Sequence, residues 1–416
     1  MKDFVRRQLI QTMTRWDCRD SHLWRASPRR LLFQVLSHVS GVRLSALEKK
    51  ELAEALENLV RHKRLLQHAA AAAGQRHIEL HLSKADTSSE YHAWERRLLA
   101  LELLPWKSQS SEQPEPIRFS FPDSLYCRIS TQLGHRKCQE FCETSNEIPY
   151  WSFLRLNTTR GPGNPEYQQI STELASLGYM TEQCKHIDNC LRVSGDGRVP
   201  VQQLDLYVRG RAEIQDESSQ VIARLVDCEP AGTVVDLCSG AGGKSLAIAT
   251  RLGRAGHLVL HEPRSRALQR AKSRLECSGL ETGPCYHFVD AAELDTWKGK
   301  ADWVLVDAPC SNTGSLRHHP ECKYRCFEHE EDKREFARLL ETQRQLLRKA
   351  CGLLKDDGML VYGTCSALVE ENDCQVLWAT SAASQLRLAT VVTHSFLPEK
   401  GGSDGYYAAV LKKQPR

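Results

Sequence analysis

The sequence predicts an α/β protein in which a C-terminal doubly wound domain follows a small α+β module and an N-terminal helical bundle. Strand and helix patterns alternate from residue 233 to the end, which is typical of a parallel sheet with helices on both faces. Apolar residues in the first hundred positions recur at helical spacing. A chain of 416 residues is also too long for one ordinary core. We therefore expect three domains, at 1–112, 117–214 and 215–416.

The composition predicts a soluble protein of a reducing compartment. Hydrophobic residues make up 41% of the chain, and no apolar run approaches the roughly 18 residues that span a bilayer, so no membrane partner is expected. The Arg-rich start of the chain also contains Asp and has no apolar signal-peptide core. The 16 cysteines are therefore interpreted as reduced thiols. We expect a cytoplasmic location, with the mitochondrion as the alternative.

The N-terminal domain is predicted to be helical and basic. Ser27-Pro28 resembles a helix start, and helical apolar spacing recurs over 52–60 and 91–103. Residues 1–80 hold 15 Lys and Arg against 8 Asp and Glu, which favours a polyanionic partner such as RNA about as much as an ordinary solvated helix face. Residues 106–116 have the Ser, Gln, Glu and Pro composition of a linker.

The middle module mixes short helices and strands. Helices are predicted at 122–133, 137–144 and 168–177, and strands at 151–156, around 191–193 and at 204–208.

The C-terminal domain is predicted to begin with a helix at 215–226 and then to alternate. Strands are expected at 233–237, 257–261, 285–289, 302–306, 358–363, 386–392 and 405–411, and helices at 243–252, 264–277, 333–354 and 369–380.

A glycine-rich turn follows the first of these strands. Ser239-Gly240-Ala241-Gly242-Gly243-Lys244 leads from the strand into a helix, where the backbone can approach a ligand and free N–H groups can face its polar end. Glu262 follows the second strand, in the place of an acid that binds ribose hydroxyls, and Asp290 follows the third, within reach of an adenine amino group. The three strand ends predict a nucleoside-type cofactor. A dinucleotide and S-adenosylmethionine fit this pattern equally well.

Two cysteines follow two further strands. Cys310 lies in Asp307-Ala308-Pro309-Cys310, and Cys365 in Thr364-Cys365-Ser366. Either cysteine alone would be interpreted as a small core residue, but both stand at the sheet edge where open α/β proteins build their sites. A thiolate that adds to carbon-6 of a pyrimidine makes carbon-5 nucleophilic, and a base must then remove the carbon-5 proton. An acid at the ring nitrogen would stabilise charge during the addition. Asp307, Cys310 and Cys365 could supply these roles.

These motifs resemble those of the Sun-type (Fmu-like) RNA cytosine-5 methyltransferases, and most closely the bacterial small-subunit rRNA enzymes with a NusB-like N-terminal domain. The resemblance covers the chain from about residue 117 onward and includes the two cysteine motifs. Further matching segments are 120–123, 154–157, 215–220, 317–320 with Lys323, 370–372 and 404–407.

The resemblance implies a Rossmann-like methyltransferase domain that uses S-adenosylmethionine. It implies that Cys365 is the nucleophile, that Cys310 assists product release and that Asp307 contacts the cytosine. The family usually has Ala-Ala-Pro-Gly-Gly-Lys where this chain has Ser239-Gly240-Ala241-Gly242-Gly243-Lys244, so a different turn is expected. The implied cofactor-binding residues are Asp236, Ser239, Gly240, Gly242, Gly243, Lys244, Glu262, Arg266, Asp290 and Asp307.

The implied activity is methylation of cytosine carbon-5 in RNA, with rRNA as the expected class and a ribosome-assembly protein as a further partner. The alternative is an RNA-binding assembly factor in which catalysis is dispensable or lost, and DNA methylation is a third, weaker hypothesis. Arg155 and Asn157 are candidates for contact with the RNA backbone. No metal is expected, because neither possible zinc set has the paired Cys-x-x-Cys spacing of structural zinc sites. The two sets are His318, His319, Cys322 and Cys326, and Cys184, His186 and Cys190.

Overall fold

A computed structural model gives the fold of the chain as two compact units. It describes residues 3–17, 46–72, 89–103, 113–157, 165–194, 201–278, 280, 283–325, 327 and 330–415. The first unit comprises Met1–Glu147 with Leu316–Glu335, and the second comprises Ile148–Ser315 with Phe336–Arg416. The helix start predicted at Ser27-Pro28 and residues 106–112 of the predicted linker lie outside the described residues.

The first unit is helical, as the sequence predicts. Leu9, Leu56, Trp94 and Leu98 are buried together in its core, and Tyr324 from the later segment joins the same cluster. The helices described in this unit are α1 (Asp3–Asp17), α3 (Ala46–Arg61), α4 (Lys63–Ala72), α6 (Ser89–Leu103), α7 (Glu115–Arg118), α8 (Asp123–Leu133), α9 (His135–Ser145) and α16 (Cys322–Arg325).

Buried cations hold segment 316–335 within the first unit. The Arg61 guanidinium donates to the backbone oxygens of Ser145 and Arg317 at 3.1 and 2.8 Å. The Lys323 ammonium donates to the backbone oxygen of Arg61 at 2.7 Å and to Oδ1 of Asn146 at 2.9 Å. Burial, followed by the charge of Arg61, lowers the pKa of Lys323 well below its ordinary value. These contacts replace the water that each cation loses on burial.

The second unit begins with a four-stranded antiparallel sheet in the order β2-β3-β1-β4. The prediction of a strand at 204–208 is wrong: α11 lies there, because a short apolar run does not by itself distinguish a strand from a helix. The strands predicted at 151–156 and 191–193 are confirmed. The elements are β1 (Ser152–Leu156), α10 (Pro165–Ser176), β2 (Met180–Gln183), β3 (Cys190–Ser194), η3 (Val201–Gln203), α11 (Asp205–Val208) and β4 (Ala212–Ile214).

The rest of the second unit is built on a seven-stranded sheet in the order β10-β11-β9-β8-β5-β6-β7. The five strands β5 to β9 are parallel, as predicted. The last two are not, since β11 pairs antiparallel with both β9 and β10. The strands are β5 (Thr233–Asp236), β6 (His257–His261), β7 (Cys285–Val289), β8 (Ala301–Asp307), β9 (Leu354–Thr364), β10 (Leu388–Phe396) and β11 (Tyr406–Lys413).

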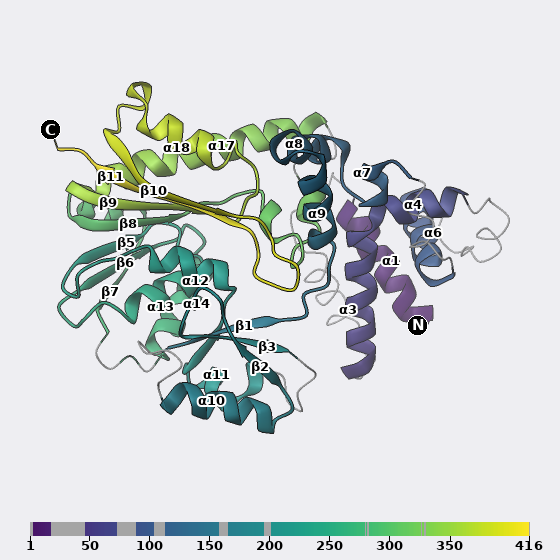
Figure 1. The fold of residues 1–416 in the computed structure, drawn as a ribbon, viewed down its shortest axis with the longest axis horizontal. Coiled ribbons are helices and arrows are strands. Elements are labelled where there is room, and N and C mark those ends of the chain that lie inside the picture. The colour runs from purple at the N-terminus through teal and green to yellow at the C-terminus, as the bar shows by residue number, and fades with distance from the viewer. Residues whose placement is uncertain are drawn as a thin grey trace. The chain divides into compact units, whose positions relative to one another are not determined.

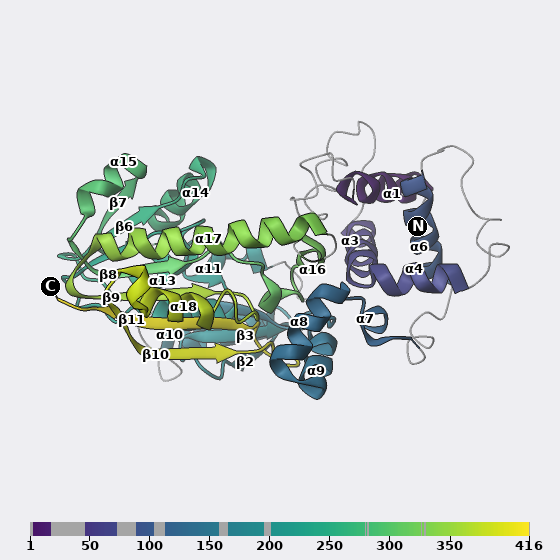
Figure 2. The ribbon, with the colours of Figure 1, turned by 90° about the horizontal axis from the view of Figure 1, so that it is seen from above.

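Helices cover both faces of this sheet (Figure 1). On one face α12, α13 and α14 bury Ile222, Leu246 and Leu275 against the strands. On the other, α15, α17 and α18 bury residues such as Leu347 and Val376, and Figure 2 shows α17 running along the strands. The helices are α12 (Glu217–Arg224), α13 (Gly243–Ala249), α14 (Ser265–Glu276), α15 (Ala291–Leu294), α17 (Glu330–Leu353) and α18 (Asp373–Thr380), with the short turns η4 (Asp295–Trp297), η5 (Thr313–Ser315) and η6 (Ala382–Ser384).

The sheet reverses its order between β5 and β8, which are parallel neighbours although β6 and β7 separate them in sequence. At such a switch point the loops leaving adjacent strands diverge and open a crevice at the carboxyl edge of the sheet. The glycine-rich turn leaves β5 and the Asp307 segment leaves β8. The predicted site residues therefore stand where this fold provides room for a ligand.

Candidate active site

The glycine-rich turn is shaped by two glycines with left-handed backbones. Gly240 has φ +54° and Gly242 has φ +81°, a region that other residues enter at a cost. A Cβ at Gly242 would also lie 2.9 Å from the Cβ of Ala271 in α14. Gly242 is the residue that caps α13, so the turn can deliver the helix N-terminus to the sheet edge only with glycine at this position.

Glu262, directly after β6, is hydrogen-bonded to this turn. Its carboxylate accepts from the Gly240 backbone N–H at 3.1 Å and from the Arg264 backbone and guanidinium at 2.7–3.0 Å. Burial opposes ionisation, but the bonds from Arg264 and Gly240 outweigh it and lower the pKa of Glu262. The residue that pairs with Glu262 is thus Arg264, which was not among the predicted site residues; both Arg264 and the predicted Arg266 are exposed.

Asp236 and Ser239 lie buried at the start of the turn. Asp236 accepts a hydrogen bond from the Ser245 hydroxyl at 2.6 Å, and burial raises the pKa of its carboxyl to about 7. The Ser239 hydroxyl is buried and has no hydrogen-bond partner among the described residues. A buried hydroxyl without a partner is costly, so this atom fits a site that completes its hydrogen bonds with a ligand.

Asp290 has a structural role at the end of β7. Its Oδ1 accepts from the backbone N–H groups of Ala292 and Glu293 at 2.8 and 2.9 Å, and the Glu293 side chain bonds back to the Asp290 N–H at 3.0 Å. This capping box starts helix α15 and fixes the carboxylate at the sheet edge. Contact of Asp290 with an adenine amino group stays a prediction.

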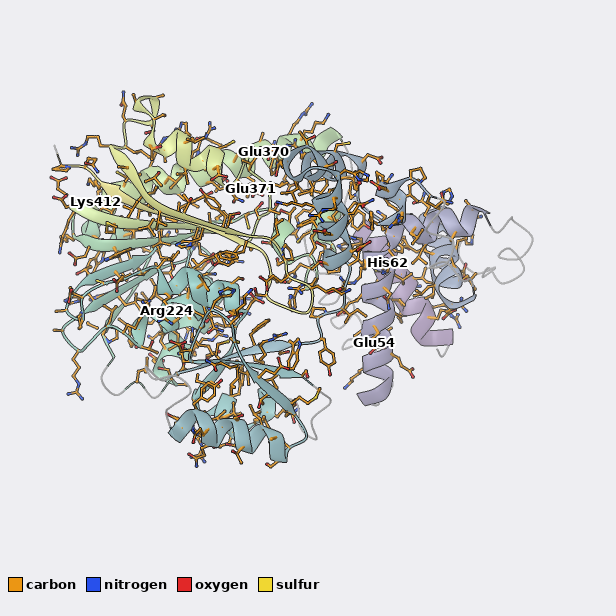
Figure 3. All side chains as sticks on the ribbon, in the orientation of Figure 1. Glu54, His62, Arg224, Glu370, Glu371 and Lys412 are labelled. Carbon is orange, nitrogen blue, oxygen red and sulfur yellow. The ribbon has the colours of Figure 1, made fainter. Side chains whose placement is uncertain are left out.

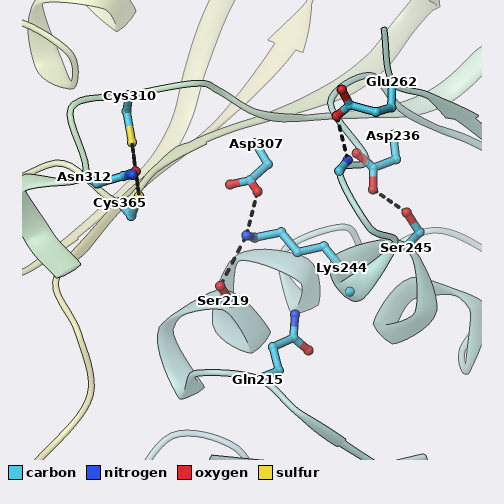
Figure 4. Close-up of polar contacts among 12 residues, drawn as sticks. Gln215, Ser219, Asp236, Lys244, Ser245, Glu262, Asp307, Cys310, Asn312 and Cys365 are labelled. Atoms are coloured by element: carbon cyan, nitrogen blue, oxygen red, sulfur yellow. Dashed lines mark hydrogen bonds and ion pairs between the residues drawn. The ribbon is translucent and has the colours of Figure 1, made fainter. Parts of the chain in front are cut away.

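Lys244 joins the cofactor turn to the Asp307 segment (Figure 4). Its ammonium lies 2.7 Å from Oδ2 of Asp307 and 3.3 Å from the hydroxyl of Ser219 in α12. Burial by itself would lower the pKa of Lys244, but the charge and hydrogen bond of Asp307 raise it above the ordinary value. The charged Lys244 side chain therefore holds the Asp307 carboxylate in place at the end of β8.

The two thiols face each other, as Figure 4 shows. The Sγ atoms of Cys310 and Cys365 are 3.1 Å apart, although 55 residues separate them in sequence. Oδ1 of Asn312 lies 2.8 Å from the Cys365 sulfur and 3.4 Å from the Cys310 sulfur. The hydrogen bond with Cys365, together with burial, raises the pKa of Cys310 well above its ordinary value. Cys310 therefore keeps its proton at neutral pH.

A fully buried glutamate supports both thiol loops. Glu371, labelled beside Glu370 in Figure 3, accepts from the backbone N–H of Ser311 at 2.8 Å and from the hydroxyls of Ser311 and Ser366, each at 2.5 Å. Gln343 of α17 donates to the same carboxylate at 3.0 Å and to the Pro309 backbone oxygen at 3.0 Å. Since Ser311 follows Cys310 and Ser366 follows Cys365, Glu371 fixes the separation of the thiols.

Arg155 is not placed for contact with an RNA phosphate, contrary to the sequence-based expectation. Its side chain is buried, and its guanidinium donates to the backbone oxygen of Gly243 at 2.8 Å, to Gln215 and to Asn157. Burial lowers the pKa of Arg155 to about 10. The arginine instead ties β1 of the small sheet to the start of α13, so the small sheet supports the cofactor turn.

Among the described residues, neither candidate zinc set brings three ligand atoms together. The sulfurs of Cys184 and Cys190 are 2.9 Å apart in the β2–β3 hairpin, but the His186 ring packs against Phe396. Cys322 is buried in the helical unit, and Cys326 lies outside the described residues.

The sequence around this site is similar to that of known rRNA methyltransferases. The profile of the family described as 16S rRNA methyltransferase RsmB/F matches residues 223–412, which include the cofactor turn and both cysteines. The ribosomal RNA small subunit methyltransferase B of Shewanella oneidensis is 31% identical, over 73% of this chain and 69% of that protein. The chain belongs to the RsmB/F family. The enzyme of the same description from Proteus mirabilis is also 31% identical, over 71% of this chain and 68% of its own.

Solved structures confirm the Rossmann-like methyltransferase fold of this RsmB/F member. The crystal structure of PH0851 covers 98% of the chain and 99% of its own length, with a TM-score of 0.71 at 20% identity. NSun6 from Pyrococcus horikoshii, solved with the S-adenosylmethionine analogue SFG, covers 71% of the chain and 99% of its own, with a TM-score of 0.60 at 16% identity. As an RsmB/F protein, the chain is an RNA methyltransferase that uses S-adenosylmethionine.

Sequence reasoning missed several residues that organise the site. Asn312 lies two positions after Cys310, and Glu371 lies in one of the matching segments, so both had a visible signal without an assigned role. Ser219 likewise lies in a matching segment, 215–220. Arg264 and Gln343 carried no comparable signal, because their importance depends on which distant loops they meet.

Proposed function

We propose that this RsmB/F protein methylates carbon-5 of a cytosine in rRNA through a covalent adduct with Cys365. The observation that carries the proposal is the thiol pair: two sulfurs 3.1 Å apart, on loops that leave the adjacent parallel strands β8 and β9. Asp307 lies at the end of the same strand β8 and is held by Lys244. A buried structural cysteine needs no such surroundings.

The reaction begins with addition. The Cys365 thiolate forms a bond to carbon-6, and the electrons of the carbon-5–carbon-6 double bond move to carbon-5. The electrons pass on to the ring nitrogen between the amino and carbonyl groups, which takes up a proton from solvent, and the Asp307 carboxylate accepts the hydrogen bond of that N–H. Because Cys310 retains its proton, it is the less suitable of the two sulfurs for attack as a thiolate, and the attack is assigned to Cys365.

Transfer and release complete the cycle. S-Adenosylmethionine, when bound, supplies the methyl group that carbon-5 attacks. A base then removes the carbon-5 proton, the double bond reforms, and the sulfur–carbon bond breaks with its electrons returning to Cys365. Cys310 assists this elimination.

The glycine-rich turn and the adjacent strand ends are the proposed cofactor site. The carboxylates of Glu262 and Asp290 stand at consecutive strand ends, and the unpaired Ser239 hydroxyl faces no protein partner among the described residues. The turn departs from the family pattern, yet its Gly240 N–H is held by Glu262, so its shape is defined without the usual proline. The remaining proposed contacts are Asp236, Gly240, Gly242, Gly243, Lys244, Arg266 and Asp307.

The decisive experiment compares two alanine variants on rRNA or small ribosomal subunits from cells that lack the protein. Cys365→Ala should reduce methyl transfer from labelled S-adenosylmethionine by about a thousandfold or more. Cys310→Ala should accumulate a protein–RNA adduct that survives denaturing electrophoresis and is absent in the Cys310→Ala/Cys365→Ala double variant. Bisulfite sequencing would locate the modified cytosine. Full activity of Cys365→Ala would overturn the mechanism.

The alternative function is an assembly factor whose catalysis is dispensable. It predicts rRNA binding without measurable S-adenosylmethionine binding in calorimetry, whereas the enzyme binds both. Methylation of a DNA duplex but not of rRNA would instead support DNA modification. The expected ribosome-assembly partner is tested by adding an extract that contains ribosome-assembly proteins. An increase in the methylation rate would show that such a partner acts with the enzyme.

A further inference from the structure

A second group of reactive side chains lies at the opposite edge of the large sheet from the thiols. His257 begins β6 and Cys285 begins β7, and the two are direct partners in the parallel register. His287 is two residues further along β7, so it points to the same face as Cys285. The proposed cofactor residue Glu262 lies five positions after His257, or roughly 16 Å away along an extended strand. The group is therefore separate from the proposed active site.

The ligand-type atoms of this group converge. Nδ1 of His257 and Nε2 of His287 are 3.0 Å apart, and the three atoms Nδ1, Nε2 and the Cys285 sulfur all lie within 4.8 Å of one another. In the described part of the chain this is the one group of three His, Cys, Asp or Glu residues with such convergence. The two candidate zinc sets suggested by sequence spacing contain none of these three residues.

We propose that His257, Cys285 and His287 form a Zn²⁺ site. Zinc binds imidazole nitrogen at about 2.0–2.1 Å and thiolate at about 2.3 Å in tetrahedral geometry, which places ligand atoms about 3.3–3.6 Å apart. The two nitrogens, 3.0 Å apart, need to separate only slightly, and the sulfur, within 4.8 Å of both, needs to approach them by about 1 Å at most. Two nitrogens and one sulfur are also a donor set that suits zinc better than the hard cations Mg²⁺ and Ca²⁺.

The surroundings of the group restrict the two imidazole rings. The ring of Trp297 packs at 4.8 Å from the His287 ring and 6.2 Å from the His257 ring and limits their rotation. The Cys285 thiol loses its proton to solvent when the sulfur–zinc bond forms.

The fourth position of the tetrahedron faces solvent. Cys285 is exposed, and β7 is the outermost strand of the sheet in Figure 1. Water can therefore complete the coordination. The site joins the first residue of β6 to the edge strand β7, whose far end carries Asp290. Its expected effect is to stabilise the pairing of these two strands.

Cobalt titration of the full-length protein tests the site, because Co²⁺ occupies zinc sites and thiolate ligation gives it a near-ultraviolet charge-transfer absorption. One equivalent of Co²⁺ should produce this absorption, and Zn²⁺ should abolish it. Cys285→Ser should remove the absorption, and His287→Gln should weaken cobalt binding at least about tenfold. The matched control is Cys277→Ser, an exposed cysteine outside the group, which should bind as the wild type does.

The outcomes separate this site from the thiol pair. Zn²⁺ should raise the unfolding temperature of the wild type but not of Cys285→Ser, while both should unfold alike without metal. The Cys310→Ala/Cys365→Ala variant should retain the cobalt absorption. If Cys285→Ser keeps the absorption, or the thiol-pair variant loses it, the metal binds elsewhere and the proposal fails. Absence of stoichiometric binding to the wild type would also overturn it.

Discussion

Two cysteine pairs in the second unit have nearly equal sulfur separations but different surroundings. Cys310 and Cys365 are 3.1 Å apart on loops at the carboxyl ends of β8 and β9. Cys184 and Cys190 are 2.9 Å apart inside the β2–β3 hairpin and are buried. The first pair is half-buried, shares the Asn312 side chain and lies on loops fixed by Glu371. Proximity of two sulfurs therefore does not identify a reactive site; the polar surroundings and partial exposure do.

The largest expected difference between the two cysteine pairs is in methylation activity after substitution by alanine. Cys365→Ala should lose methylation by about a thousandfold or more, whereas Cys190→Ala should keep its rate within about threefold. Cys190→Ala should instead lower the free energy of unfolding by about 1–2 kcal/mol, because it removes a buried side chain. Methyl incorporation and denaturant unfolding measure the two effects. A comparable loss of activity in both variants would remove the distinction between the pairs.

The second prediction concerns alkylation by iodoacetamide. Cys365 should react at least about a hundredfold faster than Cys184 and Cys190, since burial blocks access to the hairpin pair. Cys310 has a raised pKa, so its thiolate forms only as the pH rises well above neutrality, and its modification should increase only at high pH. Mass spectrometry of tryptic peptides gives each rate. Equal labelling of all four thiols in the folded protein would contradict the proposed difference in access.

The third prediction tests whether Glu371 positions the reactive pair. Glu371→Gln replaces an acceptor of several buried hydrogen bonds with an amide, and should reduce kcat about tenfold and lower the free energy of unfolding by about 1–3 kcal/mol. The KM for S-adenosylmethionine should change little, because the carboxylate does not contact the cofactor turn. The control Glu276→Gln changes an exposed residue of α14 and should leave both quantities unchanged. A variant that loses stability but not kcat would reduce Glu371 to a structural role.

The last prediction concerns pH and the buried Asp236, whose carboxyl has a pKa of about 7 in the folded protein. The ordinary value is about 3.9, so the folded state keeps a proton that the unfolded state has lost. The stabilisation by this proton is fully present below about pH 4 and is lost as the pH rises to about 7, with a slope of at most about 1.4 kcal/mol per pH unit. Between these pH limits, the free energy of unfolding measured in urea should fall more steeply with pH for the wild type than for Asp236→Asn. Parallel curves would show that Asp236 is ionised when folded.

The sequence predicted the large sheet better than the small one, for a physical reason. Strands β6 and β7 were predicted with their observed bounds, because each is a short run rich in apolar residues. The short strands β2 and β4 were missed, since β2 is mostly exposed and β4 has only three residues. The antiparallel pairing of β10 and β11 is a property of chain direction that periodicity does not contain.

The site was predictable where residues follow strand ends and not where side chains converge from afar. Cys310 and Cys365 could be paired from sequence because neighbouring parallel strands end at one edge. The group of His257, Cys285 and His287 could not, because its members form no spaced motif until the register of β6 and β7 aligns them. Arg155 was assigned to the RNA backbone as a candidate for a phosphate contact that positions the substrate, and its burial reverses that interpretation.

The return of segment 316–335 to the helical unit means that no single cut divides the chain into its two units. A fragment beginning at Ile148 would keep these twenty residues while losing Arg61 and Asn146, the partners of the Lys323 ammonium. To express the second unit alone, the N-terminal residues must be removed and segment 316–335 must be replaced by a short polar linker from Ser315 to Phe336. By the same connectivity, a gene fusion or exchange of the helical unit between relatives must transfer two separate stretches of coding sequence together.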